Sequence, residues 1–380
     1  MDIGIIGGGT MGAGIAQVAA QSGHKVVLVD LNRDVLKKAK TNHLKIFQRL
    51  IEKGKITEKD KDEAVKNLNY ETEFSKLSSS GLIIEAIVED LKIKHDVFRQ
   101  IEEIVDQNCI IASNTSSLSI ASLGSALKNS RRVIGVHFFN PAPLMPLVEI
   151  IPSVQTDPSL VPFVKELITK WGKSPVIVKD TPGFIVNRVA RPFYGEALRI
   201  YEEGIADFET IDWAMTEIGG FKMGPFTLMD YIGNDVNYAV TESVFASFYY
   251  DPRFKPSFTQ RRHAEAGFLG RKSGRGYYDY AEGATPNLPN KDQKLGQMIF
   301  LRIFSMLVNE AYDAKFMQIA SEEDIDLAMT KGVNYPKGLF AWSKELGEKV
   351  ILEELERLFH LYGEDRYRPN VLLKQKFGTD

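Results

Sequence analysis

The first half of the chain alternates short apolar runs, rich in Ile and Val, with longer amphipathic stretches. Within the runs the hydrophobicity is continuous, which favours strands covered on both faces and hence a mainly parallel sheet. The expected strands cover residues 3–6, 25–30, 82–87, 109–113, 132–139, 147–151 and 175–179. The helices expected between the early strands cover residues 10–22, 33–53 and 89–105. The pattern predicts an α/β domain.

The second half of the chain changes to a helical pattern after the turn-rich segment 180–183. Residues 188–233 align with residues 302–347 without a gap, at an offset of 302 − 188 = 114. The matched pairs include Glu196-Ala197 with Glu310-Ala311, Ile205-Ala206 with Ile319-Ala320, Ile211-Asp212 with Ile325-Asp326, and Gly224 with Gly338. An ungapped match of this length argues for two copies of one helical domain.

We therefore expect three domains and one linker. The α/β domain covers residues 1–183, and the first helical copy (copy one) covers 184–282. A linker follows at 283–295, in a region rich in Pro, Gly and Asn, and the second helical copy (copy two) covers 296–380.

Composition narrows the class of protein. The 380 residues include 47 Lys and Arg against 50 Asp and Glu, so the net charge is 47 − 50 = −3, and 44% are hydrophobic. These values exclude a disordered chain and a strongly basic nucleic-acid-binding protein. The single Cys109 fits a reducing compartment, and no apolar run reaches the ~18 residues of a membrane span. With a strand beginning close to Met1, we expect no signal peptide and a cytoplasmic location, with no nucleic-acid, membrane or metal partner.

A glycine-rich turn follows the first strand. The run GGGTMG at residues 7–12 satisfies G-x-G-x-x-G, lies between a buried strand and an Ala-rich helix, and predicts a Rossmann-type dinucleotide site. Gly7 would permit the tight turn, Gly9 the approach of a pyrophosphate, and Gly12 close packing of helix on strand. The amino end of the helix would add its free N–H groups. We place Gly7, Gly9, Thr10, Met11 and Gly12 around the cofactor.

The end of the second strand carries an acid that bears on the choice of cofactor. Asp30 lies 30 − 12 = 18 residues beyond the last glycine, near the spacing of an acid that binds ribose hydroxyls. Its charge would repel a ribose 2′-phosphate and so favours NAD over NADP, although Arg33 nearby weakens that preference. FAD uses the same glycine pattern and stays the competing cofactor at this point.

Two polar residues stand out among apolar neighbours in later strands. His137 and Glu149, each taken alone, fit a hydrogen-bonded histidine and a paired acid in the core. Taken together they suggest a pair in which the carboxylate fixes the imidazole tautomer and stabilises the imidazolium. Oxidation of an alcohol needs such a base, because a proton must leave the oxygen as hydride leaves the carbon.

Beyond these features, the chain resembles the L-3-hydroxyacyl-CoA dehydrogenases, a family that includes the bacterial 3-hydroxybutyryl-CoA dehydrogenases. The resemblance extends from Met1 to about Tyr280. The matching strings are GGGTMG at 7–12, EAIVE at 85–89, SNTSS at 113–117, HFFNP at 137–141, DTPGFIVNR at 180–188 and GPF at 224–226.

The resemblance implies a reaction and a role for each matched residue. The reaction is NAD-dependent oxidation of (S)-3-hydroxyacyl-CoA to 3-oxoacyl-CoA, or its reverse. His137 would be the general base and Glu149 its orienting partner, while Ser116 and Asn187 would hold the C3 oxygen and the thioester region of the substrate. Positions that match NAD contacts are Asp30, Glu89, Lys94, Ser116, Asn140 and Lys272. Lys53 matches a basic position that contacts CoA, and Ile46 replaces a serine of the family nearby.

Simpler interpretations stay open for several of these residues. Lys94 and Lys272 could be solvated lysines, Ser116 could cap the helix that follows it, and Asn187 could bind backbone near the domain boundary. Two other functions also stay open: a dehydrogenase of free 3-hydroxy acids, such as a sugar acid or carnitine, and a non-enzymatic NAD-binding protein.

Copy two has Leu301 at the register of Asn187, so it cannot supply the same asparagine. The resemblance implies that shorter members of the family pair this helical domain with its twin in a dimer. We expect copy two to take the place of that partner within one chain, with a homodimer as the second arrangement.

Overall fold

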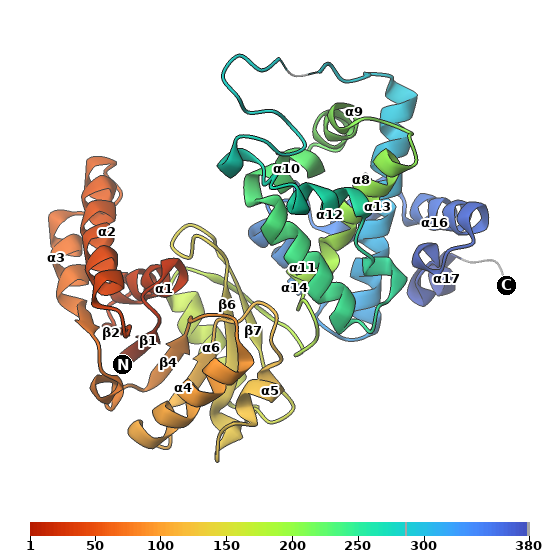
Figure 1. Ribbon diagram of the computed structural model, residues 1–380. Coiled ribbons are helices and arrows are strands. Elements are labelled where there is room, and N and C mark those ends of the chain that lie inside the picture. Colours follow the sequence, from red (N-terminus) through yellow and green to blue (C-terminus); the bar gives the residue numbers. More distant parts are fainter. Residues whose placement is uncertain (286, 378–380) are drawn as a thin grey trace. The chain divides into compact units, whose positions relative to one another are not determined.

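The computed structural model describes residues 1–285 and 287–377. The chain divides into two compact units, Met1–Phe184 and Ile185–Asp380 (Figure 1). Pro286 of the expected linker and residues 378–380 at the end of expected copy two lie outside the described residues. In the described part of the chain, no helix is long and apolar enough to cross a membrane.

Unit 1 is built on one eight-stranded sheet with the order β3-β2-β1-β4-β5-β6-β7-β8. The strands are β1 (Asp2–Ile6), β2 (Lys25–Val29), β3 (Leu68–Glu71), β4 (Leu82–Glu85), β5 (Ile110–Ser113), β6 (Val133–Phe138), β7 (Leu147–Ile151) and β8 (Ser174–Ile177). Every neighbouring pair is parallel except β6 and β7, which run antiparallel. The expected Rossmann-type, mainly parallel sheet is confirmed.

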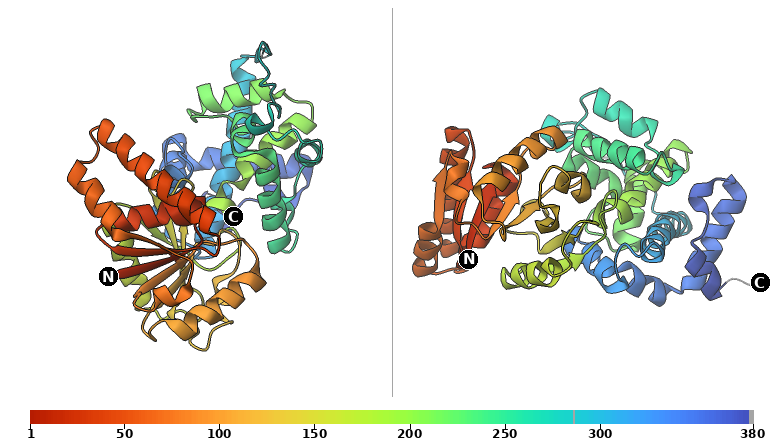
Figure 2. Two further views of the ribbon diagram at one scale, coloured as in Figure 1. Left: turned by 60° about the vertical axis from the view of Figure 1, so that its left-hand side comes forward. Right: turned by 90° about the horizontal axis from the view of Figure 1, so that it is seen from below.

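Helices cover both faces of this sheet, as Figure 2 shows. The helices of unit 1 are α1 (Thr10–Gln21), α2 (Arg33–Glu52), α3 (Glu58–Asn67), α4 (Leu91–Ile104), α5 (Ile120–Gly124) and α6 (Leu160–Lys170). Helices α1, α2, α3 and α6 share one apolar core with alternate strand residues such as Val136 and Phe138 of β6. Because side chains alternate along a strand, the residues between them point to the opposite face, where α4 and α5 lie.

Two elements at the edge of the sheet were not expected from the sequence. Strand β3 and the helix before it, α3, precede β4, in a stretch to which the hydrophobic pattern assigned nothing. The sequence of β3 is LNYE, of which only Leu68 is buried, and Ala64 is the only buried residue of α3. An edge strand and a surface helix bury too little apolar area to leave a clear periodic pattern.

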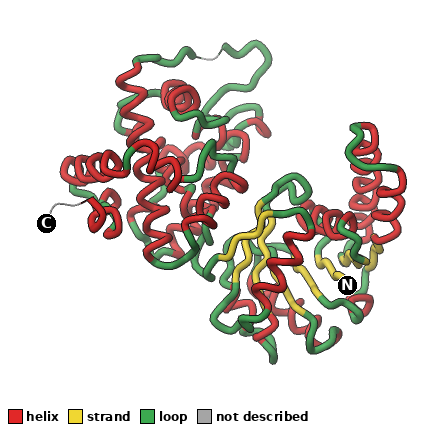
Figure 3. The backbone as a smooth tube through the Cα atoms, turned by 180° about the vertical axis from the view of Figure 1, so that it is seen from behind, coloured by secondary structure: helices red, strands yellow, loops and turns green. Residues whose placement is uncertain are grey.

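Unit 2 is helical, and apart from isolated bridges within residues 270–279 its described residues form no strand (Figure 3). Its helices are α7 (Val186–Val189), α8 (Arg191–Glu202), α9 (Phe208–Trp213), α10 (Pro225–Ile232), α11 (Asn234–Ser247), α12 (Phe258–Glu265), α13 (Gln293–Phe316), α14 (Glu322–Gly332), α15 (Leu339–Leu346), α16 (Glu348–Tyr362) and α17 (Val371–Phe377). The long helix α13 packs against α8, α15 and α16. It begins at Gln293, inside the segment 283–295 that we expected to be a linker.

Candidate active site

The glycine turn after β1 is a backbone conformation that requires glycine at two positions. Gly7 has φ +102°, and a Cβ built there would lie 2.5 Å from the Ala86 carbonyl oxygen. A Cβ on Gly12 would lie 1.8 Å from the carbonyl oxygen of Gly7. A Cβ on Gly9, by contrast, would meet nothing within 4 Å. Gly7 and Gly12 are therefore fixed by packing, whereas Gly9 faces open space into which a ligand can approach.

The surroundings of this turn fit a dinucleotide. Helix α1 begins at Thr10, and its capping residue Gly9 offers no side chain to its first N–H groups, so this end can bind phosphate. Asp30, just after β2, accepts hydrogen bonds from the N–H groups of Gly8 at 2.7 Å and Asn32 at 2.8 Å. The turn lies where the sheet order reverses, between β1 and β4, which is where open α/β sheets bind nucleotides. The residues present therefore fit NAD.

A buried ion-pair network lies at the carboxyl end of β4. Lys94 of α4 is 1% exposed, and its Nζ lies 2.6 Å from Glu85 Oε1 and 3.2 Å from Glu89 Oε2. Glu85 also accepts a hydrogen bond from Ser113 Oγ at 2.6 Å. The interpretation of Lys94 as a solvated lysine is therefore wrong, because its charge is enclosed between two carboxylates.

Glu89 holds the loop that carries Ser116. Its Oε1 accepts hydrogen bonds from the N–H groups of Ser116 at 3.1 Å and Ser117 at 3.2 Å, and from Thr115 Oγ1 at 2.5 Å. Burial by itself would raise the pKa of Glu89, but Lys94 and the hydroxyl donors outweigh it and lower that pKa. Ser116 does not cap the next helix, since Ser119 does so by accepting from the Ser122 N–H group. The alternative role for Ser116 is wrong.

His137 and Glu149 form a direct hydrogen bond. His137 Nδ1 lies 2.7 Å from Glu149 Oε2, and both side chains are buried. The two residues are register partners across the antiparallel pair β6 and β7. Side chains at directly opposite positions of such a pair lie on the same face and within reach. The sheet itself therefore brings the imidazole and the carboxylate together.

The His137–Glu149 pair has apolar surroundings and lies on the face of the sheet opposite the main core. Val136, Phe138, Val148 and Ile150 point into the core shared with α1 and α6, so the pair points to the face of α4 and α5. The imidazole also lies 4.5 Å from the Phe139 ring, between centroids. A charge formed on the imidazole is poorly solvated here, so the nearby carboxylate matters more than it would in water.

Three further residues support the site and were not singled out from the sequence. Glu85 anchors Lys94, Asn114 Oδ1 accepts from the Phe138 N–H group at 2.8 Å, and Asp180 accepts from the N–H groups of Ile120 and Ala121 at the start of α5. All three lie in or beside strings that carry the family resemblance. Their positions as polar residues at the ends of strands were the signal that could have identified them. Their hydrogen-bond partners, however, are distant in sequence and could not be identified in this way.

The other expected site residues are more dispersed. In unit 1, Asn140 is exposed just after β6 and Lys53 is exposed at the end of α2. In unit 2, Asn187 lies in α7, and Lys272 is exposed with its Nζ 2.5 Å from Asp235 Oδ1. Unit 1 thus brings together Glu89, Lys94, Ser116 and the glycine turn at the carboxyl ends of its parallel strands, with His137 near the end of β6.

Comparison with known proteins identifies relatives along the whole chain. Residues 2–181 match the family described as 3-hydroxyacyl-CoA dehydrogenase, NAD binding domain, and residues 183–280 and 298–380 match its C-terminal domain. The 3-hydroxyadipyl-CoA dehydrogenase of Escherichia coli is 38% identical, with coverage of 98% of this chain and 97% of the relative. A crystal structure of 3-hydroxybutyryl-CoA dehydrogenase from E. coli superposes with a TM-score of 0.95 at 36% identity, covering 99% of this chain and 98% of the other. A probable 3-hydroxybutyryl-CoA dehydrogenase of Deinococcus radiodurans is 42% identical over its full length and covers 74% of this chain.

Proposed function

The chain belongs to the 3-hydroxyacyl-CoA dehydrogenase family, and from this premise we propose how its residues perform the reaction. It is an NAD-dependent oxidoreductase that interconverts (S)-3-hydroxyacyl-CoA and 3-oxoacyl-CoA. NAD, when bound, supplies the hydride acceptor for the oxidation. The proposals below state which residue transfers the proton, which residues orient the substrate and how the two helical copies are arranged.

His137 is the general base in our proposal, and the observation that carries it is the buried hydrogen bond to Glu149 at 2.7 Å. Because Glu149 occupies Nδ1, the other ring nitrogen, Nε2, is the one that takes the proton from the C3 hydroxyl. The carboxylate then stabilises the imidazolium that forms. In the reverse direction the same imidazolium returns the proton to the oxygen of the 3-oxo group.

Ser116 and Asn187 are the proposed residues that orient the C3 oxygen and the thioester. Glu89 supports this role for Ser116, since it fixes the backbone of that loop through the N–H groups of Ser116 and Ser117. We assign Lys53, exposed at the end of a helix with several other basic residues, to the phosphates of CoA. The residues assigned to NAD are Gly7, Gly9, Thr10, Met11, Gly12, Asp30, Glu89, Lys94, Ser116, Asn140 and Lys272.

The substitution His137→Gln tests the assignment of His137 as the general base. We expect kcat for acetoacetyl-CoA reduction to fall about a hundredfold to ten-thousandfold, which is the usual contribution of general acid–base catalysis. NADH affinity, measured by fluorescence titration, should stay the same because the glycine turn is intact. His95→Gln is the matched control, since that imidazole bonds the Ser122 carbonyl oxygen at 2.9 Å in the same unit. A kcat for His137→Gln equal to that of the control would exclude His137 as the base.

The substrate test compares thioesters with free acids. The relatives named above act on 3-hydroxyadipyl- and 3-hydroxybutyryl-CoA, so both should be assayed alongside free 3-hydroxy acids. Turnover of the free acids at rates equal to those of the thioesters would contradict a role for CoA in binding.

We further propose that unit 2 is an internal duplication. Asp212 accepts hydrogen bonds from the N–H groups of Phe226 and Thr227 at the start of α10, at 2.9 and 2.8 Å. Asp326, 326 − 212 = 114 residues later, accepts from Phe340 and Ala341 at the start of α15, at 2.8 and 3.0 Å. The same cap at the same offset supports two copies, at 184–282 and 296–380. They are joined by the proposed linker 283–295, whose last three residues already belong to α13.

The two copies exchange reciprocal ion pairs. Arg188 of copy one lies 2.7 Å from Glu310 of copy two, and Arg302 of copy two lies 2.7 Å from Glu196 of copy one. The partners of these two pairs correspond at the offset of 114, so the two contacts are related to each other as contacts in a two-fold symmetric dimer are. Copy two therefore takes the place of a twin's helical domain. Deleting residues 296–380 should leave a protein that aggregates or dimerises through copy one, and a fully active monomeric product would contradict this role.

A further inference from the structure

The short helix α7 carries Asn187 and depends on its neighbours for its position. It has four residues, Val186–Val189, and a helix of one turn is not stable by itself. It packs against α11 of copy one and against α13 and α14 of copy two. The orientation of Asn187 is therefore set by tertiary contacts, several of which come from copy two.

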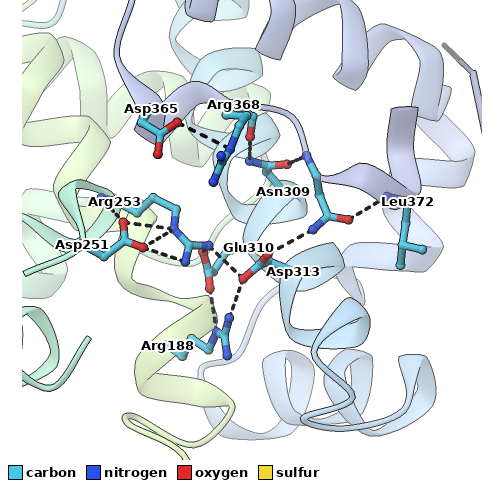
Figure 4. A network of polar contacts seen from close by, with 10 residues as sticks. Arg188, Asp251, Arg253, Asn309, Glu310, Asp313, Asp365, Arg368 and Leu372 are labelled. Atoms are coloured by element: carbon cyan, nitrogen blue, oxygen red, sulfur yellow. Dashed lines mark hydrogen bonds and ion pairs between the residues drawn. The ribbon is translucent and has the colours of Figure 1, made fainter. Parts of the chain in front are cut away.

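The residue after Asn187, Arg188, forms two ion pairs with copy two. Its Nε lies 2.7 Å from Glu310 Oε1 and its terminal Nη2 lies 2.6 Å from Asp313 Oδ2, both on α13 (Figure 4). Arg188 and Glu310 are both buried. A charged hydrogen bond to each of two carboxylates fixes a guanidinium in direction as well as in distance.

The carboxylates of Glu310 and Asp313 that bind Arg188 are also bound by a second arginine. Arg253 of copy one lies 3.1 Å from Glu310 Oε2 and 2.9 Å from Asp313 Oδ2, and Asp251 binds the other side of Arg253 at 2.9 Å. Figure 4 shows the two guanidinium groups on either side of this acidic pair. Glu310 thus cannot change its rotamer without breaking a second ion pair. The network fixes the attachment of Arg188 to α13.

The second reciprocal pair, Arg302 with Glu196, provides an internal comparison. Its Nε–Oε1 distance is also 2.7 Å, and its side chains are 3% and 2% exposed, against 4% and 3% for Arg188 and Glu310. The residue before Arg302, however, is Leu301, which can donate no hydrogen bond to a substrate. The two pairs stabilise the same interface, but only one lies beside an asparagine.

We propose that Glu310 is a positioning residue for the reaction: copy two, which has no asparagine at this register, orients Asn187 of copy one through Arg188. This inference rests on the role for Asn187 given in the proposed function. It gives copy two a part in the reaction besides covering the face of copy one.

The experiment compares Glu310→Gln with Glu196→Gln. Each change removes the charge and keeps one acceptor oxygen, so both should lower Tm. The loss should be larger for Glu310→Gln, because Glu310 pairs with Arg253 as well as with Arg188. Glu310→Gln should in addition lower kcat about tenfold to a hundredfold, since small misplacements of a positioning group have effects of this size. NADH affinity should be unchanged in both variants. Equal kcat values for the two variants would overturn the proposal.

A double-mutant cycle separates positioning from general loss of structure. Asn187→Ala should lower kcat, and adding Glu310→Gln to it should lower kcat no further, because Glu310 acts through Asn187. Multiplicative losses in the double variant would overturn the inference. If Asn187→Ala instead has the kcat of the unaltered protein, the role of Asn187 in the proposed function is wrong. This result differs from multiplicative losses, which would contradict only the role of Glu310.

Asp313→Asn provides a milder variant in case Glu310→Gln does not fold. Asp313 is 22% exposed, so its substitution leaves less uncompensated charge in the interior. It removes one of the two carboxylates that hold Arg188, and kcat should fall about threefold to tenfold at unchanged NADH affinity. An unchanged kcat in this variant would also contradict the proposal.

Discussion

Replacing Glu149 by Gln tests the electrostatic part of the mechanism. The amide is nearly the same shape and keeps an oxygen that can accept from His137 Nδ1, which lies 2.7 Å from the carboxylate in the native protein. The substitution therefore removes the negative charge while leaving the imidazole oriented. What is lost is the stabilisation of the imidazolium that forms as the substrate hydroxyl gives up its proton.

The size of the loss follows from the burial of the pair. Glu149 is 1% exposed and His137 is 6% exposed, so solvent screens their interaction little. At an effective dielectric constant of about 20, unit charges about 4 Å apart interact by about 4 kcal/mol. Since about 1.4 kcal/mol corresponds to a factor of ten in rate, kcat should fall by about a hundredfold to a thousandfold.

The assay follows the appearance of NADH absorbance during oxidation of (S)-3-hydroxybutyryl-CoA by NAD, with NADH affinity measured separately. Glu102→Gln is the control: this carboxylate lies in the same unit, near the carboxyl end of α4, and pairs with Arg132 at 3.4 Å. It should leave kcat within about twofold of the native value, as expected for a residue outside the reacting groups. A Glu149→Gln enzyme with the kcat of this control would refute the idea that the carboxylate stabilises the transition state.

Four further outcomes follow from the same structure. Gly9→Ala should leave Tm unchanged, since its Cβ would meet nothing within 4 Å, yet weaken NADH binding at least about tenfold by filling the space for the pyrophosphate; calorimetric titration that finds native affinity would place the cofactor elsewhere. Gly12→Ala should lower Tm as well, because its Cβ would lie 1.8 Å from the Gly7 carbonyl oxygen, and a native melting curve would contradict that packing. Asp30→Asn should raise the ratio of kcat/KM for NADPH to that for NADH about tenfold, because a repulsive charge is removed, and an unchanged ratio would show that Asp30 does not select the cofactor. Burial raises the pKa of Cys109 to about 11, so its thiol should react with a disulfide reagent at neutral pH about a hundredfold more slowly in the native than in the denatured protein; equal rates would contradict its burial.

The nucleotide half of the site could be predicted because its determinants are close together in sequence. A strand, a glycine turn, a helix and a second strand ending in an acid occupy one continuous stretch, and each conformational requirement falls on a single residue. Gly7 and Gly12 meet these requirements through backbone geometry. The edge elements α3 and β3 were missed for the opposite reason, since they bury few side chains and leave no periodic signal.

The environment of the charged residues could not be predicted in the same way. From the sequence, Lys94 could equally be an exposed surface lysine. Only the fold shows that its side chain is enclosed between Glu85 and Glu89. Ser116 could have been a helix cap, until the structure assigned that role to Ser119. Burial and partnership depend on what packs around a side chain, and the neighbouring sequence does not contain that information.

By itself, the sequence determined the chemical groups and the order of the elements: the glycine turn, the acid after the second strand, the histidine and glutamate in separate strands, and the offset of 114 residues between two similar helical stretches. Only the tertiary structure decided which groups meet. His137 reaches Glu149 because β6 and β7 pair antiparallel with these two residues opposite each other, although most of the sheet is parallel. Arg188 reaches Glu310 because α7 packs on α13. Both contacts depend on strand register and helix packing, which are fixed by burial of apolar surface across the whole unit and not by the residues next to each group in the chain.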